Sequence, residues 1–232
     1  MTDLQTRSII VVGATGGLGE PIASLLADAG AQLTLVARDE SHLAAIDVPG
    51  QRVAIDVRLA TSPDRIVDAA TSTYGGLDGI VYAAGAVAFG GVDELPDDVM
   101  IDLFTLNTLA PIRLLRAGLP ALRASAAAGH DPFAVHISAV VAEQPQAGMA
   151  AYSASKAALA AYDSAAMREL RREGIRLIDV RPPHTETGLA TRPLAGAAPK
   201  LPQGLEPRRV AERVVTAIRE GEKDLPSAAF TS

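Results

Sequence analysis

The stretch Ser8-Ile9-Ile10-Val11-Val12-Gly13-Ala14-Thr15-Gly16-Gly17-Leu18-Gly19 decides the fold of this chain. Its first five residues are rich in β-branched apolar side chains, which predicts a short buried strand. A glycine-rich turn follows at once, and residues 18–29 then have the amphipathic pattern of a helix that Gly30 ends. Such a turn favours nucleotide binding, because its backbone can approach a pyrophosphate closely and the phosphates meet the first amides of the helix. A turn with a purely structural role is the alternative.

Strand-like and helix-like segments alternate along the rest of the chain, which is typical of an α/β protein with a doubly wound parallel sheet and helices on both faces. The further predicted strands lie at residues 33–37, 52–57, 79–83, 133–137 and 175–180, with a short one near Leu225. The further predicted helices lie at residues 40–46, 63–74, 97–127 and 150–173, with one more ending near Glu220. We therefore expect a single Rossmann-fold domain of about seven strands over residues 1–232.

Composition narrows the classes of protein to which the chain can belong. Apolar residues make up 48% of its 232 residues and aromatic ones 3%, which predicts a core of Ala, Val, Leu and Ile. A net charge of −6, with no basic cluster denser than Arg168, Arg171 and Arg172, argues against nucleic acid as a partner. The lack of cysteine excludes disulfides and thiol catalysis, and no His/Asp/Glu spacing indicates a metal site. With no secretory signal or membrane-spanning run, we expect a cytoplasmic protein without membrane contact.

The end of the second predicted strand bears on the choice of nucleotide. NAD-binding proteins usually place an acidic residue there for the adenosine ribose, whereas this chain has Ala37 followed by Arg38. A guanidinium can bind a 2′-phosphate, so Arg38 favours NADP(H). Asp39 keeps NAD(H) open, because it could pair with Arg38 or could itself accept the ribose hydroxyls from the next position along the chain. Asp56 and Val57, at the end of the third strand, are expected to flank the adenine.

A tyrosine and a lysine form the second informative motif. The chain has three lysines against eighteen arginines, and the first lysine, Lys156, follows Tyr152 by four residues in a helical pattern. Chance would give roughly 0.05 such pairs in a chain of this composition. The two side chains share a helix face, and an ammonium beside a phenol lowers the phenol's pKa. The pair is a candidate proton-transfer device, with a tyrosine of the apolar core as the alternative.

Taken together, these segments resemble the short-chain dehydrogenase/reductase family over essentially the whole chain. They occur in the family's order: the glycine turn, Ala83-Ala84-Gly85, Asn107, Ser138, Tyr152 and Lys156. The resemblance implies hydride transfer between a nicotinamide cofactor and a small-molecule carbonyl or secondary alcohol, with Tyr152 as general acid/base. It also implies that Lys156 holds the nicotinamide ribose. A homodimer or homotetramer through the two long helices is expected.

The candidate catalytic residues are Asn107, Ser138, Tyr152 and Lys156. Ser138 ends the fifth strand, where its hydroxyl is expected to orient the substrate oxygen. Pro111 has no N–H, so the carbonyl of Asn107 loses its helical partner and can hold a water, as in the family's proton relay. A simple helix kink is the alternative. The residues expected to bind the cofactor are Gly13, Thr15, Gly16, Gly17, Leu18, Gly19, Arg38, Asp56, Val57, Ala83, Ala84, Gly85, Tyr152, Lys156, Pro182 and Thr187.

Two positions depart from the family's pattern. Pro183 follows Pro182 where the family usually has glycine, which restricts the backbone before Thr187, the match to a threonine near the nicotinamide carboxamide. Ala83 stands where the family frequently has asparagine. The small residues that let the backbone approach the adenosine are still present, so binding is expected to survive.

Residues 182–207 form a Pro/Gly/Ala-rich segment without clear periodicity. Loops of this length tend to be lids or binding segments, and this one follows a strand at the edge where ligands bind. We expect it to cover the substrate, with a variable surface loop as the alternative. Its apolar residues favour a small or lipophilic substrate.

Other polar residues give weaker signals. His136, inside a strand, is predicted to be a core histidine, and His184 could meet the substrate or lie in a surface turn. Candidates for substrate contacts, or for an exposed loop, are Glu143, Gln144 and Gln146.

Other functions fit the same glycine turn. The nearest is an NAD-dependent alcohol dehydrogenase of the same fold. A non-catalytic nucleotide sensor typically lacks the Tyr or the Lys, both of which this chain keeps. A methyltransferase has no use for the pair.

Overall fold

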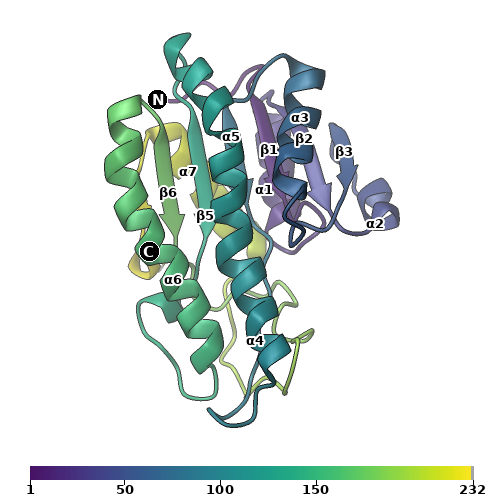
Figure 1. Ribbon diagram of the computed structural model, residues 1–232, viewed down its shortest axis with the longest axis vertical. Coiled ribbons are helices and arrows are strands. Elements are labelled where there is room, and N and C mark those ends of the chain that lie inside the picture. Colours follow the sequence, from purple (N-terminus) through teal and green to yellow (C-terminus); the bar gives the residue numbers. More distant parts are fainter. Residues whose placement is uncertain (231–232) are drawn as a thin grey trace.

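A seven-stranded sheet, parallel throughout, forms the centre of the protein (Figure 1). The computed structural model describes residues 1–230, and in this range the strand order is β3-β2-β1-β4-β5-β6-β7. The strands are β1 Ser8–Val12, β2 Gln32–Ala37, β3 Gln51–Ala54, β4 Gly79–Tyr82, β5 Phe133–Ile137, β6 Arg176–Val180 and β7 Asp224–Leu225. This order confirms the doubly wound parallel sheet that the alternation of segments predicts.

Helices cover both faces of the sheet, α1 and α7 on one and α3, α5 and α6 on the other (Figure 1). Ile9 and Val11 of β1 pack towards the first pair, whereas Ile10 and Val12 pack towards the second group, because successive strand side chains point to opposite faces. The helices are α1 Gly19–Asp28, α2 Glu40–Ala45, α3 Ser62–Tyr74, α4 Asp97–Phe104, α5 Ala110–Ala127, α6 Ala150–Leu170 and α7 Pro207–Glu220. Across residues 1–230, no helix combines the length and apolar character needed to cross a bilayer.

The register of the central strands aligns four residues from distant parts of the sequence. Val12 of β1 pairs with Tyr82 of β4, Tyr82 pairs with His136 of β5, and His136 pairs with Asp179 of β6. Because the strands are parallel, the segments that follow these residues leave the sheet at one edge. The glycine turn and Ser138 therefore lie at the same end of the molecule.

The helix predicted over residues 97–127 is divided by a π-helical turn, Thr105–Leu109, between α4 and α5. Pro111 explains this turn, because it offers no N–H to the carbonyls of Asn107 and Leu106, four and five residues earlier. The Tyr82 hydroxyl donates to the Leu106 carbonyl at 3.0 Å. A side chain from the sheet thus replaces a helical hydrogen bond.

Two other boundaries differ from those expected. β3 ends at Ala54, so Asp56 and Val57 lie in the following turn rather than at the strand end. The Asp56 carboxylate causes this turn by accepting from the backbone N–H of Arg58 at 2.9 Å. The second long helix ends at Leu170 and continues as one 3-10 turn, Arg171–Glu173.

Candidate active site

The glycine turn after β1 leaves no room for side chains. A Cβ on Gly13, whose φ is +79°, would lie 2.8 Å from the Ala84 nitrogen, and one on Gly19 would lie 1.9 Å from the Gly13 carbonyl oxygen. The turn therefore packs against the segment after β4, which begins with Ala83, while α1 starts directly behind it. Such backbone forms the kind of cradle that a phosphate group can approach.

The loop after β6 meets the same turn. A Cβ on Gly17 would lie 2.7 Å from the Cα, Cβ and carbonyl oxygen of Thr187. Thr187 thus lies against the glycine turn even though Pro183 precedes it. The carbonyl of Pro182 accepts from the N–H of Val140 at 3.0 Å, which ties the loop to the segment after β5.

An exposed arginine and a helix cap follow β2. Asp39 caps α2, accepting from Ser41 Oγ at 2.6 Å and from the His42 N–H at 3.0 Å. These two hydrogen bonds hold the pKa of Asp39 below its ordinary value. Asp39 therefore caps α2, and both Arg38 and Asp39 are exposed at this corner.

Asp56 forms one of the two ion pairs of Arg58. Arg58 Nη2 lies 2.7 Å from the Asp56 carboxylate, and Nη1 lies 2.9 Å from the carboxylate of Asp102 on α4. Hydrogen bonds from Arg58 lower the pKa of Asp56, and the charge of Arg38 adds to this effect. Arg38 and Asp56 thus share one corner of the molecule, where Val57 is buried in the core.

Asn107 joins three segments beneath the carboxyl edge. Its side chain exchanges two hydrogen bonds of 2.9 Å with the backbone of Ala86 and donates to Ser155 Oγ on α6 at 3.0 Å. A Cβ on Gly85 would lie 3.3 Å from Asn107 Oδ1 and 3.4 Å from Lys156 Nζ. The structure therefore brings together Gly85, Asn107 and Lys156.

Tyr152 and Lys156 lie in the first turns of α6 and are 7% and 4% exposed. The ammonium of Lys156 donates to the carbonyl of Ile137, at the end of β5, at 2.8 Å. Burial lowers the pKa of Lys156 to about 8, although the charge of Asp179 opposes this shift. Burial also raises the pKa of Tyr152 to about 12.

The direction for Tyr152 is opposite to the lowering that the Tyr–Lys spacing predicts. The reason is the apolar cluster around the phenol, which contains Val87, Phe89, Leu103, Ala139 and Val141. An apolar environment disfavours the charged phenolate, and burial is what raises the pKa of Tyr152. Tyr152 is therefore protonated at neutral pH in this structure, which suits a proton donor.

Ser138 does not direct its hydroxyl to this phenol. Its Oγ donates to Asp179 Oδ1 at 2.5 Å and lies 3.2 Å from the carbonyl oxygen of Val180. Among residues 1–230 no hydrogen bond joins it to Tyr152, and the next residue, Ala139, belongs to the apolar cluster that contains Tyr152. The Ser138 hydroxyl was expected to orient a substrate oxygen. In this structure it donates instead to the carboxylate of Asp179 on β6.

Comparison with known proteins identifies the family of this chain. The family model described as short chain dehydrogenase matches residues 7–195, which include the glycine turn and the pair Tyr152 and Lys156. The chain belongs to the short-chain dehydrogenase family. As a member it is an oxidoreductase of the dehydrogenase/reductase type.

Individual relatives of this short-chain dehydrogenase are distant. Ipsdienol dehydrogenase of Ips pini is 30% identical over 208 residues, covering 83% of this chain and 79% of the relative. A short-chain dehydrogenase from Streptomyces avermitilis has a TM-score of 0.83 at 26% identity, covering 97% of this chain and 90% of the other. One from Burkholderia cenocepacia, solved in complex with NADP, has the same TM-score at 22% identity, covering 98% and 90%.

Sequence reasoning missed a charged network beside the site of this short-chain dehydrogenase. Arg181, which follows β6, forms ion pairs with Asp179, with Glu143 at 2.5 Å and with Asp224 at 2.6 Å. Glu143 also accepts from Ser227 Oγ at 2.5 Å. Glu143 is therefore engaged in the network rather than turned towards a substrate. The sequence signal for this network was Asp179, an acidic residue inside a predicted strand.

A second buried pair lies next to this network. His136 Nδ1 and Asp163 Oδ1 on α6 are 2.7 Å apart, and both side chains are fully buried. This confirms His136 as a core histidine. Within the described residues of the chain, His136 Nε2 and Asp163 Oδ2 have no hydrogen-bond partner.

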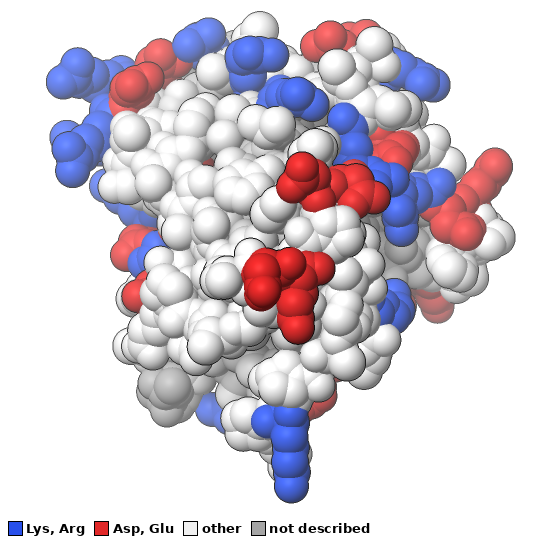
Figure 2. Space-filling view, turned by 60° about the horizontal axis from the view of Figure 1, so that its bottom comes forward, with Lys and Arg blue, Asp and Glu red and all other residues white. Residues whose placement is uncertain are grey.

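The loop over residues 182–207 covers Tyr152. Leu189, Ala190 and Ala195 pack against the cluster around the phenol. The Leu194 N–H donates to the Val87 carbonyl at 2.8 Å, and the Phe89 N–H donates to the Ala195 carbonyl at 3.0 Å. Figure 2, turned towards the lower end of Figure 1, shows a face on which uncharged side chains predominate, with acidic side chains near its centre and side chains of both charges around its rim.

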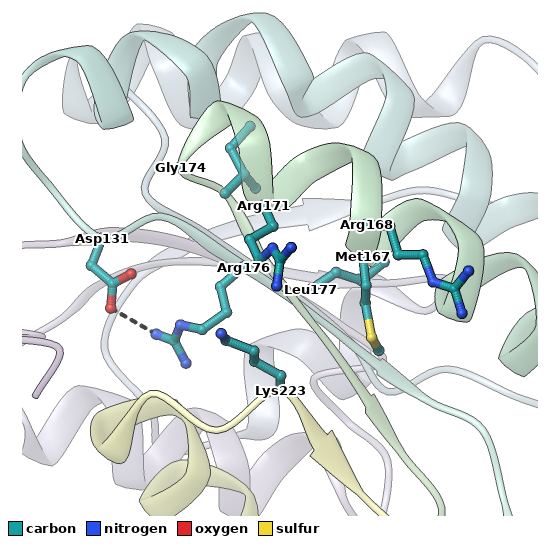
Figure 3. A pocket seen from close by; sticks show the side chains of 9 residues that line it. Asp131, Met167, Arg168, Arg171, Gly174, Arg176, Leu177 and Lys223 are labelled. Atoms are coloured by element: carbon teal, nitrogen blue, oxygen red, sulfur yellow. Dashed lines mark hydrogen bonds and ion pairs between the residues drawn. The ribbon is translucent and has the colours of Figure 1, made fainter.

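A cavity of about 460 Å³ lies at the far end of α6 from Tyr152 (Figure 3). Arg168, Arg171, Arg176 and Lys223 line it, and Arg176 pairs with Asp131 at 2.9 Å. Tyr152 is the third residue of α6, whereas Arg171 follows its last residue. This cavity therefore does not belong to the candidate active site.

Proposed function

We propose that this short-chain dehydrogenase transfers a hydride reversibly between NADP(H) and a small-molecule ketone, aldehyde or secondary alcohol. The observation that carries the proposal is the buried phenol of Tyr152, one helical turn from the buried ammonium of Lys156 and under an apolar loop. The nicotinamide supplies or accepts the hydride when it is bound. The protein's own residues bind the cofactor and the substrate, orient them, and transfer the proton.

The glycine turn fits a dinucleotide, because added Cβ atoms at Gly13, Gly17 and Gly19 would meet backbone within 2.8 Å. We assign the pyrophosphate to this turn and the adenosine to the corner of Arg38, Asp56 and Val57. Other residues assigned to the cofactor are Thr15, Gly16, Leu18, Ala83, Ala84, Gly85, Tyr152, Lys156, Pro182 and Thr187. Arg38 favours NADP(H), and the NADP complex of the Burkholderia cenocepacia relative is consistent with this choice.

In the direction of reduction, the Tyr152 O–H bond breaks and its proton moves to the carbonyl oxygen as the hydride reaches the carbonyl carbon. In oxidation, the phenolate removes the alcohol proton. After reduction the Tyr152 phenolate takes a proton from the Lys156 ammonium, and the Lys156 amine takes one in turn from the water that we assign to the Asn107 carbonyl; in oxidation the two transfers run in reverse. The apolar cluster and the loop over residues 182–207 exclude bulk water and favour an apolar substrate.

Paired titrations with NADPH and NADH test the cofactor assignment. We expect tighter binding of NADPH, and Arg38→Ala to raise its Kd about 10- to 100-fold, the value of a lost charge-assisted contact, with little change for NADH. Arg219→Ala, an exposed arginine at the end of α7, is the matched control. Equal effects on both nucleotides, or none, would contradict the assignment and favour the NAD-dependent alternative.

Tyr152→Phe tests the chemistry. Turnover of a carbonyl substrate should fall about 100- to 10,000-fold, as for loss of a general acid, while NADPH still binds. Turnover that persists in Tyr152→Phe would exclude Tyr152 as the acid. A wild-type protein that binds the nucleotide without turning over any carbonyl or alcohol would favour the sensor instead.

A further inference from the structure

We propose that Ser138 and Asp179 are positioning residues for Lys156, acting through the Ile137–Ser138 peptide, and that Ser138 does not contact the substrate. This inference rests on the proposed function of Tyr152 and Lys156, and it assigns Ser138 a different role from the one that its place in the sequence suggests.

Ser138 is hydrogen-bonded to β6 through both its backbone and its side chain. Its N–H donates to the Val180 carbonyl at 2.8 Å, and its hydroxyl donates to Asp179 at 2.5 Å. Ser138 is 3% exposed and Asp179 is 1% exposed. A hydroxyl has one proton, so donation to this buried carboxylate removes the proton that would orient a substrate oxygen.

The same peptide unit holds the lysine. The Ile137 carbonyl that accepts from Lys156 Nζ at 2.8 Å is bonded directly to the Ser138 nitrogen. Because a peptide unit is planar, fixing the Ser138 end also fixes the direction of the Ile137 carbonyl. The position of the ammonium therefore depends on two contacts of Ser138 with β6.

Asp179 also acts on Lys156 by its charge. Burial makes the ammonium costly, and the carboxylate of Asp179 opposes this cost. Asp179 is itself retained in the core by its hydrogen bond with Ser138 and its ion pair with Arg181. His136 on β5 and Asp163 on α6 form a second buried pair near these groups, and burial together with the charge of Asp163 raises the pKa of Asp179.

Arg181 connects this pair to the loop that leads to Tyr152. Besides Asp179 it binds Glu143, four residues beyond Ala139, and the exposed Asp224 on β7. Ala139, the residue after Ser138, belongs to the apolar cluster around the Tyr152 phenol and has no hydroxyl. Tyr152 is thus left as the protein group that donates to the substrate oxygen, and the neighbouring network serves the lysine.

The first test follows the protonation of Lys156 without cofactor or substrate. The chain has three lysines, so ¹³Cε-labelled lysine gives three NMR signals, and Lys156→Arg identifies the one that titrates near pH 8. We expect Asp179→Asn to lower this midpoint by about one pH unit, because the favourable charge is lost and Arg181 is left unbalanced. Asp224→Asn, which removes another partner of Arg181, should leave it in place.

Ser138→Ala is a milder second variant and should lower the same midpoint by less than Asp179→Asn. A midpoint that is unchanged in both variants would overturn the proposal. Because this readout needs no turnover, it separates failure of the positioning pair from failure of the proposed oxidoreductase function.

The second test uses kinetics with a carbonyl substrate. We expect Ser138→Ala to lower kcat less than about tenfold, to shift the alkaline limb of its pH profile towards lower pH, and to leave KM unchanged. The double variant Ser138→Ala/Asp179→Asn should lose no more than Asp179→Asn alone, because the serine acts through the aspartate. A loss of about 100-fold or more in Ser138→Ala, with the alkaline limb unmoved, would show that the hydroxyl contacts the substrate.

Discussion

At the scale of single side chains, the buried ammonium of Lys156 is costly to the folded state. It is a cation with 4% exposure, and burial brings its pKa from 10.5 to about 8. One hydrogen bond to the Ile137 carbonyl and the charge of Asp179 offset some of that cost. A group kept under such conditions is retained for its chemistry rather than for stability.

Replacing this ammonium should stabilise the protein. The unfolded chain keeps the lysine proton up to about pH 10.5, whereas the folded chain releases it near pH 8. Between these values the unfolded state binds more protons, so wild-type stability rises with pH. Lys156→Met should therefore raise the free energy of unfolding at pH 7 by about 1–3 kcal/mol, and this advantage should vanish by pH 10.5.

Urea denaturation at several pH values measures this effect. Lys223→Met, at an exposed lysine near β7, is the control for the loss of a lysine charge at the surface. A Lys156→Met variant that is less stable than wild type at pH 7 would mean that its contacts outweigh the cost of burying its charge.

The sequence predicts Tyr152, Lys156 and Asn107 because each signal is local: a four-residue spacing, or a proline four residues away. It does not predict the direction of the Ser138 hydroxyl, which Asp179 decides from 41 residues further along the chain. It also does not predict the pKa of Tyr152, because the residues that bury the phenol come from several separate segments.

At the scale of the elements, the loop over residues 182–207 contains a glycine, Gly196, that has no room for a side chain. Gly196 has φ +70°, and a Cβ there would lie 2.0 Å from the Phe89 carbonyl oxygen. Gly188 has φ +72°, but its nearest neighbour would be 3.7 Å away, at the end of the Arg192 side chain. The two glycines share the same backbone strain on substitution and differ in the space around them.

Gly196→Ala should detach the loop from the segment 87–89, whereas Gly188→Ala should not. Trypsin can cut after Lys200, within the loop, so its rate of cleavage measures how often the loop opens. We expect cleavage about tenfold faster in Gly196→Ala than in Gly188→Ala. This factor corresponds to a loss of roughly 1.4 kcal/mol in the free energy of loop closure. Equal rates in the two variants would show that the contact with Phe89 does not hold the loop.

Element order and type follow from the sequence, because buried β-branched runs and amphipathic helices have distinct periods. The interruption at Thr105–Leu109 could be anticipated only incompletely. Pro111 predicts a freed carbonyl, but the Tyr82 hydroxyl that meets the Leu106 carbonyl comes from another strand. The early end of β3 depends on a turn that Asp56 makes with Arg58.

For the protein as an assembly, we propose a homodimer or homotetramer through the two long helical regions. Ile101, Phe104 and Leu109 follow one another along α4 and the π-helical turn with 65%, 36% and 42% exposure. Large apolar side chains exposed together favour contact with another protein surface. A second copy of the chain is the partner that we propose.

Light scattering on the purified protein tests this proposal. We expect a dimer or tetramer, and Ile101→Glu/Phe104→Glu should weaken association about tenfold or more by placing charges in the contact. Val92→Glu is the control, since Val92 is 93% exposed and lies outside this surface. A wild-type monomer at micromolar concentration would exclude the assembly.

The attachment of the loop also has a consequence for the timing of turnover. Two backbone hydrogen bonds join it to residues 87–89, and their net worth is about 1–3 kcal/mol. An equilibrium of that size leaves the loop open for roughly 1–15% of the time. Loops of this kind move within microseconds to milliseconds, whereas an ordinary enzyme turns over about ten times a second. Substrate would thus meet an open entrance many times in each catalytic cycle, and passage into the site would not limit the rate.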